Sequence, residues 1–206
     1  MPLLGYGEDA LTLHALTTGL PELFRQLGDS TDPRDSVRFF RPSFGRRSSR
    51  PGAESARSLF GEFDGVIGST KAVYLVEAKW AGSGELRGRQ LKLRPEQQRR
   101  HVAFRTYLEG WRRTPSDSWE AFAARIKPVL AERTDGLVPP SAETTLARNL
   151  EYVLRRLASS GSDIIDVLLF SRMSAAQAVP ERCGDFCIVT HLSEPEEGSG
   201  FIRLLD

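Results

Sequence analysis

Two rhythms of hydrophobic and polar positions run along the chain, and each predicts one kind of element. Leucines recur at roughly helical spacing over residues 8–27, which predicts a helix that Pro21 divides or kinks. The same spacing, with Pro95 in a first turn and Ser141 as a cap, predicts three later helices, at residues 94–111, 116–133 and 141–159. Short apolar runs bounded by turn residues predict strands, at residues 35–45, 59–68, 71–80, 163–171, 185–193 and 201–205.

The order of these elements predicts an α/β fold. A helix, three strands and a helix come first, and further strands follow the later helices, which is the pattern of a mixed β-sheet flanked by helices. The continuous apolar run at 163–170 is typical of a strand that is covered on both faces. We therefore expect a single domain over residues 1–206, with a helical insertion at about 116–159.

The composition is that of an ordinary globular domain. Of the 206 residues, 40% are hydrophobic and 27% are charged, and no apolar run approaches the roughly 20 residues that a membrane-spanning helix needs. No basic leader precedes an apolar stretch, and Cys183 and Cys187 match neither a disulfide framework nor a zinc motif. His14 and His191 have no partners at metal-ligand spacing. We expect a cytoplasmic protein without a membrane partner.

The positive charge is concentrated in arginine. The net charge is only +1, which argues against a surface that binds polyanions over the whole protein. Arginines nevertheless crowd two short segments, residues 38–50 and 87–105, and the guanidinium fork matches the geometry of phosphate. These two segments are candidates for phosphate contacts.

The strand at 71–80 ends in two charged residues, although most of it is apolar. Glu77 and Lys79 are two positions apart, so they point to the same face, and charged side chains are seldom buried without a partner. A hairpin that turns near residues 69–70 would place Asp64, on the preceding strand, beside Glu77. Two adjacent carboxylates repel each other, and a bound cation would remove that cost.

Carboxylate oxygens and water are the ligands that suit Mg²⁺. Asp64 and Glu77 could hold the ion, and the carbonyl of Ala78 could supply another ligand. Such a site polarises a phosphodiester and acidifies a water molecule, while Lys79 orients that water or stabilises the developing charge. The alternative is an ion pair at a sheet edge, in which Glu77 pairs with Lys79 or an arginine and Asp64 caps a turn.

Two short motifs resemble those of the PD-(D/E)XK nuclease superfamily: FDGVI at 63–67 and VEAKW at 76–80, across a hairpin and before a helix. The resemblance covers about residues 1–111 and the strand at 163–171, because the restriction-endonuclease-like fold runs helix, three strands, helix and strand. Phe63 stands where the name-giving proline would be, and many members lack that proline. The resemblance implies a Mg²⁺- or Mn²⁺-dependent nuclease that hydrolyses phosphodiester bonds, with DNA as the substrate by family analogy.

The resemblance also implies further site residues. A glutamate on the first helix often completes the metal site in such nucleases, and Glu8 is the candidate here, with Glu22 as the alternative. Several branches add a glutamine from the helix after the lysine strand. Helical spacing favours Gln97, which continues the face of His101, whereas Gln98 falls to one side. The implied catalytic residues are Asp64, Glu77, Lys79, Glu8 and Gln97, and the implied metal ligands are Asp64, Glu77, Ala78 and Glu8.

A nuclease of this kind would bind phosphates on both sides of its metal site. The expected phosphate contacts are Arg41, Arg46, Arg47, Arg50, Arg87, Arg89, Arg99, Arg100 and His101, the last of which could equally be a packing residue. The protein would act as a homodimer or as a subunit of a larger complex. Two other functions stay open: a catalytically weak or inactive nucleic-acid-binding subunit of a repair or defence complex, and a protein-interaction module.

Overall fold

The computed structural model describes residues 3–44, 59–81, 86–87, 89–114, 116, 118–197 and 199–205. The chain forms two compact units. The first contains Met1–Arg41, Asp64–Leu93 and Gly161–Asp206, and the second contains Pro42–Phe63 and Arg94–Ser160. The helices expected as an insertion belong to the second unit, together with the helix that precedes them in the chain.

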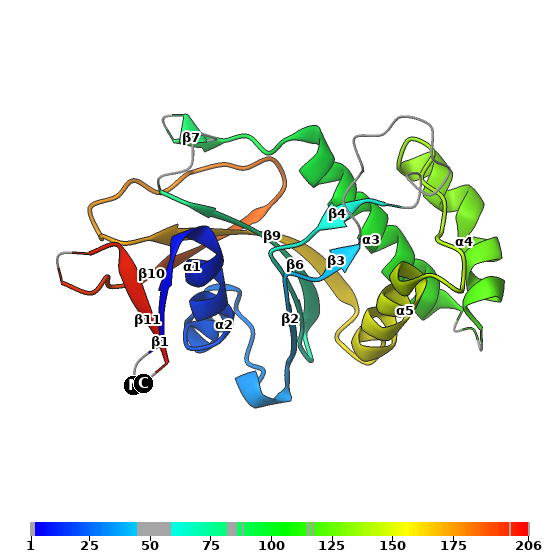
Figure 1. The fold of residues 1–206 in the computed structure, drawn as a ribbon, viewed down its shortest axis with the longest axis horizontal. Coiled ribbons are helices and arrows are strands. Elements are labelled where there is room, and N and C mark those ends of the chain that lie inside the picture. The colour runs from blue at the N-terminus through cyan, green and yellow to red at the C-terminus, as the bar shows by residue number, and fades with distance from the viewer. Residues whose placement is uncertain are drawn as a thin grey trace. The chain divides into compact units, whose positions relative to one another are not determined.

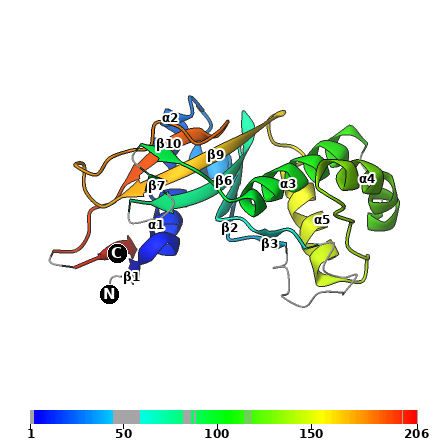
Figure 2. The ribbon, with the colours of Figure 1, turned by 90° about the horizontal axis from the view of Figure 1, so that it is seen from above.

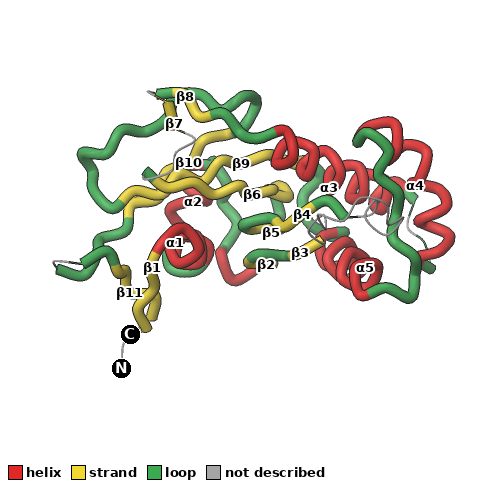
Figure 3. Tube along the Cα trace, turned by 45° about the horizontal axis from the view of Figure 1, so that its top comes forward, coloured by secondary structure: helices red, strands yellow, loops and turns green. Residues whose placement is uncertain are grey.

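A five-stranded mixed sheet forms the centre of the first unit, in the order β10-β9-β6-β5-β2 (Figure 3). The strands β2 (Val37–Phe40), β5 (Gly65–Gly68) and β6 (Ala72–Trp80) pair in antiparallel fashion. The next strand, β9 (Asp163–Arg172), runs parallel to both β6 and β10 (Cys187–Leu192). With five helices in the described part of the chain, the predicted mixed α/β class is confirmed.

Two small sheets complete the first unit. The strand β1 (Leu3–Tyr6) pairs with β11 (Phe201–Leu205), and β7 (Leu86–Arg87) pairs with β8 (Gln90–Leu91). A short 3-10 helix, η1 (Pro33–Asp35), leads into β2. The sequence predicts β11 but neither β1 nor the β7–β8 pair, because a run of two to four residues is too short to carry a periodic signal.

Two helices, α1 (Gly7–Leu16) and α2 (Leu20–Gln26), lie side by side in the first unit (Figure 1). Pro21 lies in the first turn of α2, so the predicted break in the N-terminal helix is confirmed. Leucines of both helices pack against one face of the sheet and form its main apolar core with β5, β6, β9 and β10. The sheet therefore presents its other face away from these two helices.

Side chains alternate along β6 as a strand requires. Tyr74, Val76 and Ala78 belong to the core that α1 and α2 cover. Glu77 and Lys79 therefore share the opposite face, yet Glu77 is only 1% exposed and Lys79 only 6%. The predicted common face of the two charged residues is confirmed, and the structure adds that both are buried.

Two of the predicted strands are split. The strand predicted at 35–45 is interrupted where Arg41 adopts a left-handed backbone (φ 48°) ahead of Pro42. The strand predicted at 59–68 is interrupted just before β5, where the carbonyl of Asp64 accepts a hydrogen bond from the N–H of Arg41 (3.2 Å). The two breaks therefore lie at Arg41 and Asp64, whose backbones contact each other and not a regular strand ladder.

A buried carboxylate fixes the turn between β5 and β6. Asp29 is 7% exposed and accepts hydrogen bonds from the hydroxyl groups of Ser69 (2.6 Å) and Tyr74 (2.7 Å). The N–H of Thr31 donates a third hydrogen bond to it (2.9 Å). The hydroxyl of Ser69 also accepts from the N–H of Ala72 (3.0 Å). Burial by itself would raise the pKa of Asp29, but the hydrogen bonds outweigh it and hold that pKa below its ordinary value.

Replacement of this carboxylate by its isosteric amide is expected to destabilise the fold. In Asp29→Asn an amide NH₂ group faces hydrogen-bond donors, so the free energy of unfolding at pH 7 falls by about 2–4 kcal/mol. Because the folded pKa is lowered, the carboxylate stabilises the fold above the unfolded pKa of about 3.9, and that stabilisation is lost as the pH falls through the folded pKa. Urea unfolding at a series of pH values measures the difference between variant and parent, which should shrink in acid.

Asp35→Asn is the matched control, because the Asp35 side chain is exposed. We expect its free energy of unfolding to stay within about 0.5 kcal/mol of the parent. Equal losses in the two variants, or a deficit in Asp29→Asn that does not change with pH, would contradict the role of Asp29 in the turn.

In its described residues, the second unit contains three helices and a short strand pair. The helices α3 (Pro95–Arg113) and α4 (Trp119–Arg133) form a helical hairpin, and α5 (Thr145–Leu157) packs beside α3 (Figure 2). The strands are β3 (Ser43–Phe44) and β4 (Gly61–Glu62), which pair in antiparallel fashion. Within the described residues, no helix of either unit combines the length and the apolar character that crossing a bilayer requires.

Aromatic side chains fill the core of the second unit. The predicted apolar stripe of α3 is confirmed, since Phe104, Leu108 and Trp111 are at most 3% exposed. The ring of Trp111 meets that of Phe122 edge-on, with centroids 4.8 Å apart. Such edge-to-face contacts between helices contribute to the stability of the α3–α4 hairpin.

The cap predicted for α5 was placed too early in the chain. Thr144, rather than Ser141, is the N-cap, and its hydroxyl oxygen accepts a hydrogen bond from the N–H of Ala147 (3.1 Å). The carbonyl of Ser141 instead accepts a hydrogen bond from the Thr144 hydroxyl (2.7 Å). Both residues are good caps by type, and the turn between them decides which one the helix uses.

Candidate functional site

The β5–β6 hairpin brings two carboxylates to the end of a central strand. Gly65 pairs with Val76, so the next pair in the same register is Asp64 with Glu77. The carboxylate of Asp64 accepts a hydrogen bond from the N–H of Ala78 (2.7 Å), which holds it against β6. The predicted hairpin and its register are confirmed.

Lys79 forms an ion pair with Glu77 inside the first unit. Its Nζ donates hydrogen bonds to Oε1 of Glu77 (2.9 Å) and to the carbonyl of Ala78 (2.7 Å). The sequence left open that this pair lies at a sheet edge, but β6 lies between β5 and β9 and is a central strand. The edge-strand explanation is therefore wrong, although the ion pair itself is present.

The electrostatics of this strand end favour a cation. Burial raises the pKa of the Asp64 carboxyl to about 7, and the negative charge of Glu77 adds to the effect. Burial alone would lower the pKa of Lys79, but the negative charges of Glu77 and Glu8 outweigh it and the pKa of the ammonium is raised. Lys79 thus stays positively charged and can donate hydrogen bonds but cannot act as a base near neutral pH.

The two glutamates considered for the first helix differ in their surroundings. Glu8 lies in the first turn of α1, with its Oε1 3.9 Å from Nζ of Lys79. Glu22 lies on α2, where Arg25 (2.6 Å) and Gln26 (3.0 Å) donate hydrogen bonds to it. The hydrogen bond from Arg25 is the main reason that the pKa of Glu22 falls to about 2. Of the two, Glu8 is the one that the structure places beside Lys79.

The donor atoms at this strand end are of the type that a hard divalent cation binds. Asp64, Glu77 and the carbonyl of Ala78 offer oxygen ligands, and the mutual repulsion of the two carboxylates is the cost that a cation would remove. In the described part of the chain, however, no three His, Cys, Asp or Glu side chains form a group that could hold a metal ion. The carboxylates of Asp64 and Glu77 and the carbonyl of Ala78 are oxygen ligands that fit Mg²⁺. Glu8 is linked to this group through the ammonium of Lys79.

The arginines expected to bind phosphate are only partly described. The backbone N–H of Arg41 bonds to Asp64, and its guanidinium pairs with Asp9. Arg89 is exposed and pairs with Glu181 (2.8 Å). Arg87 lies in β7, and nothing is described of its side chain. Three further arginines lie outside the described residues: Arg46, Arg47 and Arg50.

The remaining candidates belong to the second unit. The side-chain oxygen of Gln97 accepts a hydrogen bond from the N–H of Arg94 (2.7 Å) and thereby caps α3. His101 is 2% exposed and packs against Phe63, with ring centroids 4.9 Å apart, which favours the alternative role of a packing residue. The guanidinium of Arg100 stacks on the same ring at 5.4 Å, and Arg99 lies 3.7 Å from the carboxylate of Asp135.

A pair of histidines in the first unit has no signal in the sequence. His14, in the last turn of α1, and His191, in β10, are 177 positions apart, yet their ring nitrogens lie 2.8 Å from each other. Neither histidine has a partner at metal-ligand spacing in the sequence, yet the fold makes them neighbours. No spacing rule could have found the pair, because the partners belong to elements at opposite ends of the chain.

The strand end of β6 combines two neighbouring carboxylates, an ammonium group and a backbone carbonyl. Such a group can hold a divalent cation and can stabilise negative charge that develops on a phosphate. Comparisons of the chain with models of protein families, with curated proteins and with solved structures found no match.

Proposed function

We propose that the chain is a Mg²⁺-dependent nuclease with a restriction-endonuclease-like core and that its substrate is DNA. The observation that carries the proposal is the hydrogen bond from Ala78 N–H to Asp64, which sets the Asp64 and Glu77 carboxylates at the same strand end as the ammonium of Lys79. The sheet supports it as well. Three antiparallel strands followed by the parallel strand β9 match the order that the resemblance implies.

In the proposed reaction, Asp64 and Glu77 hold Mg²⁺ or Mn²⁺, with the carbonyl of Ala78 and the carboxylate of Glu8 as further oxygen donors. When bound, the ion supplies polarisation of the phosphate and acidification of a water molecule. Lys79 donates hydrogen bonds at the same place and so orients the attacking water or stabilises charge on the phosphate. The raised pKa of Lys79 keeps it a donor in this role.

Positively charged residues around this strand end are proposed to bind the DNA backbone. Arg41 is the first of them, because its backbone is bonded to Asp64 and its side chain lies 33% exposed in an ion pair with Asp9. A homodimer, or a larger complex in which this chain is one subunit, would supply the second active site that a double-strand break requires.

Cleavage assays on the purified full chain test this proposal directly. Linear, circular and single-stranded DNA are incubated with Mg²⁺, with Mn²⁺ or with EDTA. We expect metal-dependent cleavage by the parent and a loss on the order of 10²–10³-fold in Lys79→Ala, which is the usual effect of removing one donor that stabilises developing charge. The matched control is Lys127→Ala, at an exposed lysine of α4, which should cleave as the parent does.

The alternatives give different results in the same assay. Undiminished cleavage by Lys79→Ala would rule out the proposed mechanism. Tight DNA binding without cleavage would favour a nucleic-acid-binding subunit, and neither binding nor cleavage would favour a protein-interaction module. If Lys127→Ala reduced cleavage as much as Lys79→Ala does, the activity would depend on general electrostatics and not on the β6 strand end.

A further inference from the structure

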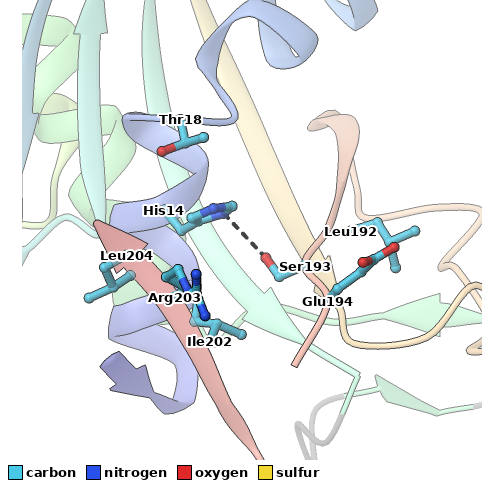
Figure 4. A pocket seen from close by; sticks show the side chains of 8 residues that line it. All are labelled: His14, Thr18, Leu192, Ser193, Glu194, Ile202, Arg203 and Leu204. Atoms are coloured by element: carbon cyan, nitrogen blue, oxygen red, sulfur yellow. Dashed lines mark hydrogen bonds between the residues drawn. The ribbon is translucent and has the colours of Figure 1, made fainter. Parts of the chain in front are cut away.

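The pair of histidines in the first unit forms a three-atom polar cluster with a serine. Nδ1 of His14 lies 2.8 Å from Nε2 of His191. The hydroxyl oxygen of Ser193 lies 2.9 Å from the same Nε2 and 3.4 Å from Nδ1 of His14. Figure 4 shows the hydroxyl of Ser193 directed at the His14 ring from the segment that follows β10. Three polar heteroatoms thus meet at one point, where one ring nitrogen donates a hydrogen bond to the other.

The backbone leaves room for this cluster. A Cβ atom at Gly19 would lie 2.5 Å from Cε1 and 2.8 Å from Nδ1 of His191, so a side chain at that position would displace the imidazole. His191 is 4% exposed and Ser193 is 2% exposed. Two of the three groups are therefore buried, and the third, His14, is half-buried.

Both imidazoles are neutral near pH 7. Burial lowers the pKa of His14, and burial together with the proximity of His14 lowers the pKa of His191 to about 4. A neutral imidazole has a lone pair on one ring nitrogen, which is the form that binds metal ions. The ring that donates the hydrogen bond would bind an ion in its other tautomer, with the proton moved to its second ring nitrogen.

Two pockets reach the cluster from solvent. One, of about 460 Å³, is lined by His14, Ser193 and Glu194 among others (Figure 4). The other, of about 370 Å³, is lined by both His14 and His191 and includes Glu22 in its wall. An ion has access from either side, and water can occupy the remaining coordination positions.

The donor set selects the class of metal. Imidazole nitrogen suits Zn²⁺ and other divalent ions of the later first transition series, whereas Mg²⁺ prefers oxygen ligands. Nitrogens bound at about 2.0–2.1 Å to one tetrahedral ion lie about 3.3–3.4 Å apart, so the two rings must separate by roughly 0.5 Å on binding. No three His, Cys, Asp or Glu side chains of the described residues form a metal-binding group. The ligands that the protein supplies here are therefore two imidazoles and a hydroxyl.

We propose that His14, His191 and Ser193 form a binding site for a Zn²⁺-class transition-metal ion, separate from the carboxylate site of β6. The bound ion joins α1 to β10 and so stabilises the first unit. The proposal does not depend on the nuclease function, because the ligands, the metal class and the location all differ from those of the carboxylate site.

Metal binding to the full chain, freed of metal with EDTA, provides the test. We expect one Zn²⁺ per chain by calorimetric titration, visible absorption bands of a four-coordinate site when Co²⁺ is the probe, and a higher melting temperature with Zn²⁺ that Mg²⁺ does not reproduce. In His14→Ala the affinity for Zn²⁺ should fall by more than tenfold, since even the outer-shell partners of metal ligands are worth about 10–100-fold.

Two further variants make the test decisive. Cys187→Ser removes the exposed thiol of β10, the other group of that strand with affinity for Zn²⁺, and should leave binding unchanged. His191→Gln keeps much of the side-chain volume and should weaken binding as His14→Ala does, with the fold of each variant checked by circular dichroism in EDTA. Binding that survives in both histidine variants, binding lost in Cys187→Ser, or no saturable binding by the parent overturns the proposal.

Discussion

Asp64→Asn is expected to lose metal-dependent DNA cleavage while it keeps its fold. The asparagine oxygen can still accept the hydrogen bond from the N–H of Ala78, so the hairpin remains joined to β6. The charge that would hold the ion is gone. Because a metal ion contributes several kcal/mol of charge stabilisation and each 1.4 kcal/mol is a factor of ten, cleavage should fall on the order of 10³-fold.

Stability separates this result from a trivial loss of structure. Removal of one of two neighbouring carboxylate charges relieves their repulsion, so the melting temperature of Asp64→Asn in EDTA should equal or exceed that of the parent. Asp35→Asn, at an exposed carboxylate outside the β5–β6 hairpin, is the control and should retain full cleavage. Wild-type cleavage by Asp64→Asn would remove Asp64 from the site, and a large drop in its melting temperature would assign it a structural role instead.

Gly161→Ala should destabilise the first unit more than the addition of a single methyl group at any other position of that unit. Gly161 lies just ahead of β9, separated from it by Ser162, and its N–H donates a hydrogen bond to the carbonyl of Ser69 (2.9 Å). A Cβ atom there would overlap the carbonyl group of Lys71 and lie 2.5 Å from the backbone nitrogen of Ala72. These atoms belong to backbone and not to a side chain that can rotate away.

The overlap cannot be relieved without moving the β5–β6 turn away from β9. We expect the free energy of unfolding to fall by at least about 3 kcal/mol, the range reached when a substitution forces packed backbone apart. Urea unfolding, followed by circular dichroism, measures the loss. Ser162→Ala, one residue further along, introduces the same side chain at an exposed position and should cost less than about 0.5 kcal/mol. Similar stabilities of the two variants would show that the turn tolerates the movement.

Gly161 lies against the turn of the β5–β6 hairpin, and Asp64 lies at the other end of the same hairpin. Gly161 and the Asp29 network hold the turn, and Asp64 and Glu77 lie where the two strands reach the other end. The rigid turn therefore supports the register that sets the carboxylates side by side. A displacement at the turn would be transmitted along two paired strands to the candidate metal site.

Much of this arrangement is encoded locally. The period of two along a strand places Glu77 and Lys79 on one face wherever β6 lies, and the short turn fixes the hairpin register that brings Asp64 opposite Glu77. Helical spacing is similarly sufficient to predict that Phe104, Leu108 and Trp111 are buried. Local backbone geometry decides all of these features, so they can be predicted from the sequence without knowledge of the fold.

Long-range packing decided the rest. The type and order of the main elements, and the hairpin with its charged end, follow from local patterns along the chain. Packing between distant segments buries Glu77 and Lys79 in a central strand, brings Glu8 to Lys79 and brings His14 to His191. The physical reason is that each of these contacts joins elements whose relative position follows from the packing of the whole core, which no periodic pattern within one segment records.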